Sequence, residues 1–277
     1  MKLVTWNTQS CTGLDGRVSP QRIVDGALAL ADFDVLCLQE ISDDGPGADQ
    51  AADIAQRLPG FRVFFGAAQD SFEDGRRRRF GNLVATRLPV ARLQHHPLPF
   101  PADAGTESTP RMCTVVTVLD PRLGPVRVMT THLEFYSQRQ RLAQARALRA
   151  LHLEYFDQAR SPPRDARQLA TEAILCGDFN SPPGSEAYAA VAETSERSTL
   201  RDAWPLVHGD RPQPPTFCVH EQRYLPQPVA FDFFFVTDGL KDHVRRIDVD
   251  GASRASDHQP VALELGPGAG GAGPGTL

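Results

Sequence analysis

The chain has 277 residues, of which 41% are hydrophobic and 23% charged, a composition typical of a globular protein. Its formal net charge of −5 gives no overall positive field that would attract duplex nucleic acid or an anionic membrane. No export signal and no membrane-spanning apolar run is visible, so we expect a cytoplasmic protein without a membrane span. The five cysteines are odd in number and lack C-x-x-C spacing, which argues against a disulfide framework or a structural zinc site.

The first part of the chain alternates strand-like and helical patterns. We expect strands at 2–6, 34–38, 61–65 and 80–86, and helices at 20–31 and 49–58. Residues 70–79 read as a polar loop, whose run of four arginines from Arg76 is more typical of a solvated surface than of a substrate contact. Residues 94–110 read as a long irregular loop because they contain four prolines and a glycine.

The remaining elements complete a mixed pattern. We expect strands at 112–119, 126–131, 231–236 and 260–265, a long helix at 138–158, a short helix at 185–191 and a proline-rich loop at 205–228. The glycine-rich segment 266–277 is predicted to be a disordered tail. Strands outnumber helices, and both hairpin and helix-crossover links occur, which predicts a layered α/β fold in one domain spanning 1–265.

The segment from Ile174 to Pro183 reads ILCGDFNSPP and carries the strongest local signal. A buried apolar strand ends at Gly177, and a carboxylate (Asp178) and a carboxamide (Asn180) follow it on the same side of the chain. An isolated sequence of this kind is most often a turn. A charged group at the end of an apolar strand is otherwise hydrogen-bonded, bound to a metal or used in chemistry.

Similar polar side chains stand at the ends of other predicted strands. Taken singly, Asn7 reads as a turn residue, whereas an acid among phenylalanines, such as Asp232, needs a partner. If the strand ends share one edge, several carboxylates meet and repel unless a cation neutralises them. Oxygen ligands favour Mg²⁺ or Mn²⁺ over zinc, and the chemistry implied is hydrolysis at phosphorus. The set comprises Asn7, Glu40, His132, Asp178, Asn180, Asp232, Asp257 and His258.

Six short motifs surround these residues: T-W-N (5–7), L-Q-E (38–40), T-H-L-E (131–134), G-D-F-N (177–180), F-D-F (231–233) and S-D-H (256–258). In this order and spacing, the chain resembles the endonuclease/exonuclease/phosphatase family of metal-dependent hydrolases. The segment 131–149 resembles the branch that contains tyrosyl-DNA phosphodiesterases and uncharacterised bacterial members. The tyrosine that abasic-site nucleases place near the phosphate has no clear counterpart. The resemblance implies a four-layer α/β sandwich of two packed mixed sheets flanked by helices.

The resemblance also implies a role for each matching residue. Asn7 and Glu40 would hold Mg²⁺ or Mn²⁺ with Asp257 close by, and Asp178 would orient or activate water. The remaining catalytic residues would contact the phosphate, stabilise its oxygens or pair with an imidazole; they are Asn180, His132, His258 and Asp232. Arg111 opens a strand after a long loop, where it would clamp a phosphate, and Asn82 lies in a segment like the family's glycine–asparagine strand; both are candidate substrate-binding residues.

The leading hypothesis is a Mg²⁺- or Mn²⁺-dependent phosphoesterase that hydrolyses a phosphodiester or phosphomonoester by metal-assisted attack of water. One alternative is a nuclease or a phosphodiesterase acting on DNA ends or tyrosyl-DNA, and another is a catalytically silent binding module on the same scaffold. A zinc hydrolase is disfavoured because only two histidines and no cysteine belong to the set. The expected partner is a phosphate-ester substrate, with nucleic acid among the candidates and no obligate protein partner. Loops 94–110 and 205–228 are expected to shape the pocket.

Overall fold

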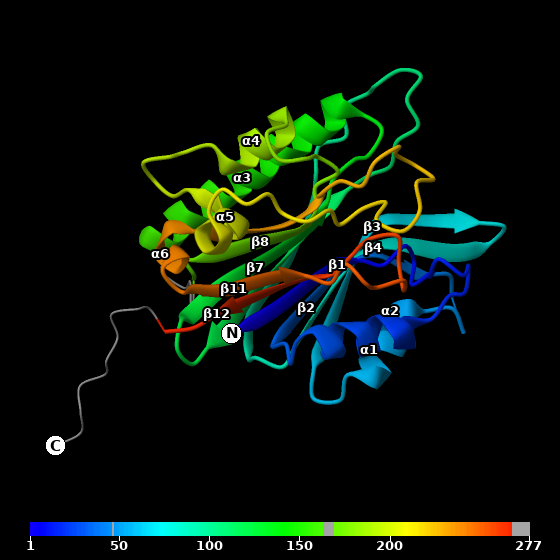
Figure 1. Cartoon of the computed structure of the whole chain (residues 1–277), viewed down its shortest axis with the longest axis horizontal. Coiled ribbons are helices and arrows are strands. Elements are labelled where there is room, and N and C mark those ends of the chain that lie inside the picture. The colour runs from blue at the N-terminus through cyan, green and yellow to red at the C-terminus, as the bar shows by residue number, and fades with distance from the viewer. Residues whose placement is uncertain (46, 163–168, 268–277) are drawn as a thin grey trace.

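The computed structural model describes residues 1–45, 47–162 and 169–267, which form two mixed six-stranded sheets packed face to face (Figure 1). The first sheet has the order β11 (Val244–Val249), β12 (Val261–Leu265), β1 (Lys2–Asn7), β2 (Val35–Asp43), β4 (Arg76–Thr86), β3 (Arg62–Glu73). The second has the order β5 (Val90–Pro97), β6 (Met112–Asp120), β7 (Gly124–His132), β8 (Ala173–Asp178), β10 (Asp232–Thr237), β9 (Leu200–Asp202).

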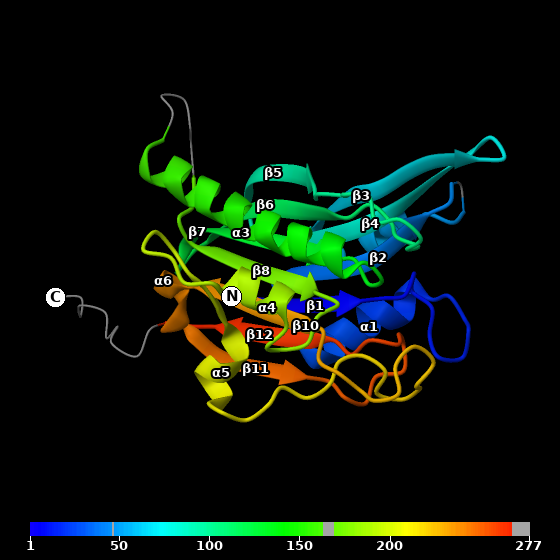
Figure 2. The same cartoon turned by 90° about the horizontal axis from the view of Figure 1, so that it is seen from above.

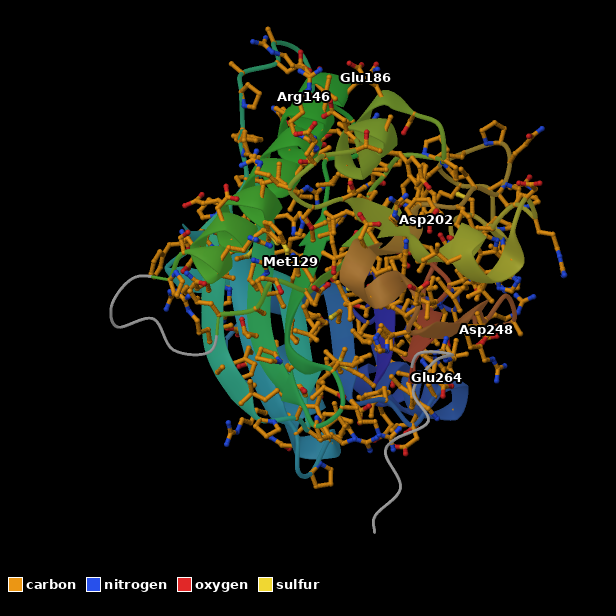
Figure 3. The ribbon with its side chains drawn as sticks, turned by 90° about the vertical axis from the view of Figure 1, so that its left-hand side faces the viewer. Met129, Arg146, Glu186, Asp202, Asp248 and Glu264 are labelled. Carbon is orange, nitrogen blue, oxygen red and sulfur yellow. The ribbon has the colours of Figure 1, made fainter. Side chains whose placement is uncertain are left out.

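Helices cover the outer faces of the two sheets. They are α1 (Pro20–Leu30) and α2 (Gln50–Arg57) on the first sheet, and α3 (Gln138–Arg160) and α4 (Glu186–Ala192) on the second. The short helices α5 (Ala203–His208) and α6 (Asp238–Lys241) instead contribute buried residues to the core between the sheets. Figure 2 shows α3 lying across the second sheet, and Figure 3 shows Arg146 of α3 beside Glu186 of α4, with nitrogen and oxygen 3.5 Å apart. The predicted four-layer α/β sandwich is confirmed. Among the described residues, no helix combines the length and apolar composition needed to cross a membrane.

Strand β8 shows why its sequence reads as an unbroken apolar run. Ile174 and Cys176 face the core between the sheets, whereas Ala173 and Leu175 face the layer under α3 and α4. Both faces are buried, so alternation between polar and apolar residues is lost. All five cysteines of the chain are buried and free, and behave as small apolar side chains.

Gln39 ties the two sheets together beneath the edge where the parallel strands end. Its Nε2 donates to Thr5 Oγ1 of β1 at 3.1 Å and to Thr130 Oγ1 of β7 at 2.9 Å. The side chain is fully buried, so these hydrogen bonds form away from water. They fix the relative position of the sheets close to that edge.

The topology brings several strand ends to this edge. β1 runs parallel to β2 and β7 parallel to β8, so their carboxyl ends meet there. β10 runs antiparallel to β8, and the register pairs Asp232 with Asp178, while β7 pairs His132 with the same residue. β12 is antiparallel to β1, so the residues that precede it also lie at this edge.

The structure corrects three loop predictions. Residues 70–79 are not a loop: β3 and β4 form a long hairpin that turns at Asp74 and Gly75, both with positive φ. The charges that suggested a solvated loop are cross-strand ion pairs, such as Arg77 with Asp70. β5 occupies part of the predicted loop 94–110 as an edge strand, and α5 extends into 205–228.

Strands β9 and β11 were also missed, because they are short or half-exposed at sheet edges. The predicted tail lies, from residue 268, outside the described residues.

A buried contact between His152 of α3 and Arg127 of β7 joins helix and sheet. Arg127 Nη2 lies 3.2 Å from His152 Nδ1, and Ser198 Oγ lies 3.0 Å from Nε2. Burial, followed by the positive charges of Arg127 and Arg149, lowers the pKa of His152 to about 3. The imidazole is therefore neutral in the folded protein near neutral pH.

His152 should make the protein less stable in mild acid. The unfolded chain binds a proton at this residue near pH 6.5 and the folded chain does not, so stability falls as pH drops below 6.5. Between pH 7.5 and 5.5, denaturant unfolding of the wild type should lose about 1.4 kcal/mol that His152→Gln does not lose. An equal loss in both proteins would show that His152 does not titrate differently on unfolding.

Candidate active site

A cavity of about 170 Å³ opens at the shared edge of the two sheets, and most of the predicted site residues line it. Glu40 comes from β2, His132 from the end of β7, and Asp178 from the end of β8. Asn180, Asp257 and His258 come from the segments that follow β8 and precede β12. The site therefore takes side chains from both sheets.

Asn7 connects two carboxylates across the sheets. Its Nδ2 donates to Glu40 Oε1 at 3.0 Å and to Asp178 Oδ2 at 2.9 Å. Its Oδ1 accepts a hydrogen bond of 3.1 Å from the backbone of Gln9. Because burial disfavours charge, the pKa values of Asp178 and Glu40 are both raised above their ordinary ranges, and nearby Asp232 and Asp257 respectively raise them further.

His258 stands between two buried acids. Its Nδ1 lies 2.8 Å from Asp232 Oδ2, and its Nε2 lies 3.6 Å from Asp178 Oδ2. Burial alone would lower the pKa of His258, but the two carboxylates raise it to about 10, so the ring is an imidazolium at neutral pH. Phe217 stacks on this ring with centroids 4.5 Å apart, and Trp6 Nε1 donates to the His258 carbonyl at 2.9 Å.

The second imidazole, His132, is held in the opposite charge state. Burial, then the positive charges of Arg111 and His258, lower its pKa well below the ordinary value. Arg111 Nη1 lies 2.9 Å from its Nδ1, and Asn180 Nδ2 lies 3.1 Å from its Nε2. Buried Glu134 accepts from Arg111 Nε at 3.3 Å, which fixes the guanidinium at the wall of the cavity.

Local backbone geometry aims the side chains. Glu40 has φ +58 and lies at a bulge where β2 leaves regular register with β4, and Asn180 has φ +46. Such conformations cost a non-glycine residue about 1–3 kcal/mol and persist where the surroundings impose them. At Gly177 a Cβ atom would lie 1.9 Å from the Thr131 carbonyl oxygen, so only glycine allows β7 and β8 to approach this closely.

The donor set fits a hard divalent cation. Glu40 and Asp257 both line the cavity, and among the described residues neither forms an ion pair with a lysine or arginine. Two carboxylates with a carboxamide between Glu40 and Asp178 are the oxygen ligands that Mg²⁺ and Mn²⁺ prefer. In the structure Asn7 presents its nitrogen, not its oxygen, to the two acids.

Asp178, Asp232 and His258 form a second group whose ligand atoms lie within 4.8 Å of one another. Here the imidazolium of His258 already neutralises the acids through both of its nitrogens. Asp232 is fully buried, although its Oδ1 has no hydrogen-bond partner among the residues that the structure describes. We interpret this group as a charge-compensated triad rather than as a cation site.

Three predicted site residues, Asn7, Asp232 and Asn82, do not line the cavity. Asn7 and Asp232 hydrogen-bond to residues that do, whereas the contact of Asn82 is elsewhere. Asn82 is buried, and its Nδ2 donates to the carbonyl of Met112 at 3.2 Å, so it ties β4 to the strand that begins after Arg111. Sequence reasoning also missed the aromatic walls, which consist of Phe135, Tyr136, Phe217 and Tyr224. Two of these come from loop 205–228, which was expected to shape the pocket, but its composition did not single them out.

The fold and this set of side chains define a class of hydrolases that act on phosphate esters. The model of the Endonuclease/Exonuclease/phosphatase family matches residues 4–258, and the chain belongs to that family. A comparison with curated proteins gives no match.

Solved structures share the fold over almost the whole chain. An endonuclease/exonuclease/phosphatase from Beutenbergia cavernae is 26% identical, with a TM-score of 0.68 and coverage of 97% of this chain and 72% of that one. The mannosyl-6-phosphatase Bt3783 of Bacteroides thetaiotaomicron is 19% identical, with a TM-score of 0.68 and coverage of 96% and 99%. The human Nocturnin catalytic domain is 21% identical, with a TM-score of 0.67 and coverage of 96% and 93%.

Removing the Asp232 carboxylate should lower the pKa of His258. In metal-free protein, an NMR titration of Asp232→Asn should show the His258 pKa at least one unit below the wild-type value, because one of the two acids that favour the imidazolium is gone. Asp248→Asn, on the distant strand β11, should leave it unchanged. An unaltered His258 titration in Asp232→Asn would refute this assignment of its charge.

Proposed function

We propose that the protein is a Mg²⁺- or Mn²⁺-dependent phosphoesterase that hydrolyses a phosphomonoester or phosphodiester by attack of water. The observation that carries the proposal is the meeting, in one cavity, of oxygen ligands for a cation, a carboxylate with a raised pKa, two imidazoles in opposite charge states and an arginine. These are the groups that metal-assisted hydrolysis at phosphorus requires.

The cation would be held by Glu40, Asp257 and the carboxamide of Asn7. When bound, it polarises the phosphoryl oxygens. Asp178 would orient the attacking water and accept its proton. Asn7 holds this carboxylate in place, and so does the backbone N–H of Asn180 at 2.8 Å. The positive charge of the His258 imidazolium offsets the negative charge of the carboxylates beside it.

Arg111, His132 and Asn180 form the wall that would face the phosphate. Arg111 is 9% exposed and reaches the cavity with its orientation fixed by Glu134. A guanidinium and neutral hydrogen-bond donors stabilise the charge that develops on the phosphoryl oxygens. In this proposal Asn82 acts indirectly, by holding the start of β6 next to Arg111.

A catalytically silent binding module is the less economical interpretation. Burying Asp178 and Asp232 close to the half-buried Glu40 costs folding free energy, and a scaffold gains nothing from that cost. The activities named for the structurally similar proteins differ from one another, and identities near 20% transfer the fold rather than a substrate.

Activity should require a divalent cation. Purified protein treated with EDTA should lose hydrolysis of p-nitrophenyl phosphate or bis(p-nitrophenyl) phosphate, and added Mg²⁺ or Mn²⁺ should restore it. Glu40→Gln should need more cation for half-maximal activity because it removes one anionic ligand. Full activity in EDTA, or a Glu40→Gln protein with an unchanged cation requirement, would count against the assigned cation site.

Asp178→Asn should lower kcat by about 10²–10⁴-fold, because it removes the group that accepts the proton of the attacking water. The substitution is isosteric and relieves a buried charge, so circular dichroism and the unfolding midpoint should show a folded protein. Asp248→Asn provides the matched control on the surface, where it is labelled in Figure 3, and should retain wild-type turnover. Near-normal turnover by folded Asp178→Asn would overturn the proposed role.

A further inference from the structure

A second hollow, which we call the hairpin groove, continues from the active-site cavity along the β3–β4 hairpin. It has a volume of about 350 Å³ and shares Glu40, Arg111 and Tyr136 with the cavity. Figure 1 shows this hairpin extending beyond the sheet edge at which β1 ends. If a phosphate ester enters the cavity from the hairpin side, the part of it beyond the phosphate therefore lies in the hairpin groove.

The arginines of the hairpin groove are already neutralised. Arg78 Nη1 lies 2.9 Å from Glu73 Oε2, and its Nε lies 4.0 Å from Asp44 Oδ1. Arg79 Nε donates to Asp43 Oδ2 at 2.7 Å. Both arginines of the groove are thus engaged by acids of the hairpin or of the end of β2.

The hairpin groove is acidic beyond the cation site. Apart from Glu40 and the Arg111–Glu134 pair, its lining carries the three acids Asp44, Glu73 and Glu107 against the two arginines Arg78 and Arg79. Within the described part of the chain, Glu107 forms no ion pair. A nucleic-acid strand, which carries one negative charge per nucleotide, gains no attraction from this surface and meets repulsion from Glu107.

The other lining groups suit neutral hydroxyls. Ser71, Ser108 and Gln69 offer donors and acceptors, and exposed Glu107 is a strong acceptor. Carboxylates and hydroxyls together match the hydroxyl groups of a sugar or polyol, each of which both donates and accepts.

The arrangement of the acids indicates which part of the substrate enters this groove. Asn7 separates Asp178, which would hold the water, from Glu40, which would hold the cation. In-line displacement places the leaving oxygen opposite the attacking water. Glu40 lines both hollows, whereas Asp178 lines only the cavity, so the hairpin groove lies on the Glu40 side of the site and would receive the leaving group.

Resting on the proposed phosphoesterase function, we infer that the hairpin groove is a leaving-group subsite for an uncharged, hydroxyl-rich skeleton. The substrate class is then a phosphate ester of a sugar or polyol rather than nucleic acid. Glu107 is assigned as a specificity residue that accepts hydrogen bonds from the leaving group's hydroxyls.

The test compares kcat/KM at fixed Mg²⁺ for a hexose 6-phosphate, a phosphorylated single-stranded oligonucleotide and p-nitrophenyl phosphate. The hexose phosphate should exceed the oligonucleotide at least tenfold. Glu107→Ala should lower kcat/KM for the hexose phosphate about fivefold to tenfold and leave p-nitrophenyl phosphate unchanged, since one hydrogen bond to a charged group is lost. Glu196→Ala, an exposed acid outside the groove, is the matched control.

A preference for the oligonucleotide, or a Glu107→Ala protein that loses all three substrates equally, would overturn the inference. If the proposed function itself is wrong, the protein will not hydrolyse p-nitrophenyl phosphate in a metal-dependent way, which is a different result. In that case, calorimetric binding of hexose 6-phosphate and oligonucleotide to the Mg²⁺-loaded wild type decides the substrate class without turnover. Tighter oligonucleotide binding would contradict the inference, and tighter hexose phosphate binding would support it.

Discussion

The site depends on the hydrogen bonds that the Asn7 amide makes to two carboxylates on different sheets. Glu40 belongs to β2 and Asp178 to β8, and both lie in surroundings that disfavour charge. A single nitrogen at 3.0 and 2.9 Å holds them at a fixed separation. Asp178 also accepts a hydrogen bond from the backbone of Asn180, but Asn7 is the residue that bonds to both acids.

The two imidazoles of the candidate site differ in charge because their neighbours differ. The pKa of His258 is raised because acids flank it on both sides, and the pKa of His132 is lowered by burial and then by the positive charges of Arg111 and His258. His258 therefore brings positive charge to the site, and His132 is a neutral ring that forms hydrogen bonds. Their difference follows from position alone, since both histidines lie at this edge and both are buried.

The position of the site could be predicted from the sequence because strand ends have a local signature. The apolar run before Asp178 and the lone acid Asp232 among phenylalanines both indicated buried strands with a polar group at one end, and the family motifs supplied the layered fold. The β3–β4 hairpin could not be predicted in this way, because its arginines resemble a loop until their partners Asp43 and Asp70 are in place. The contact of Phe217 with the site could not be predicted for a related reason, since its stacking on His258 depends on the path of a proline-rich loop.

Gln39 has a consequence for how this protein adapts to a substrate. By joining β1 to β7 in the core, it resists sliding of the layers past one another just below the candidate site. The strand ends that carry the candidate site are therefore held in register with one another across the two sheets. New specificities would arise by altering the β3–β4 hairpin and the loops around the cavity entrance, while the strands that carry the candidate site residues stay unchanged.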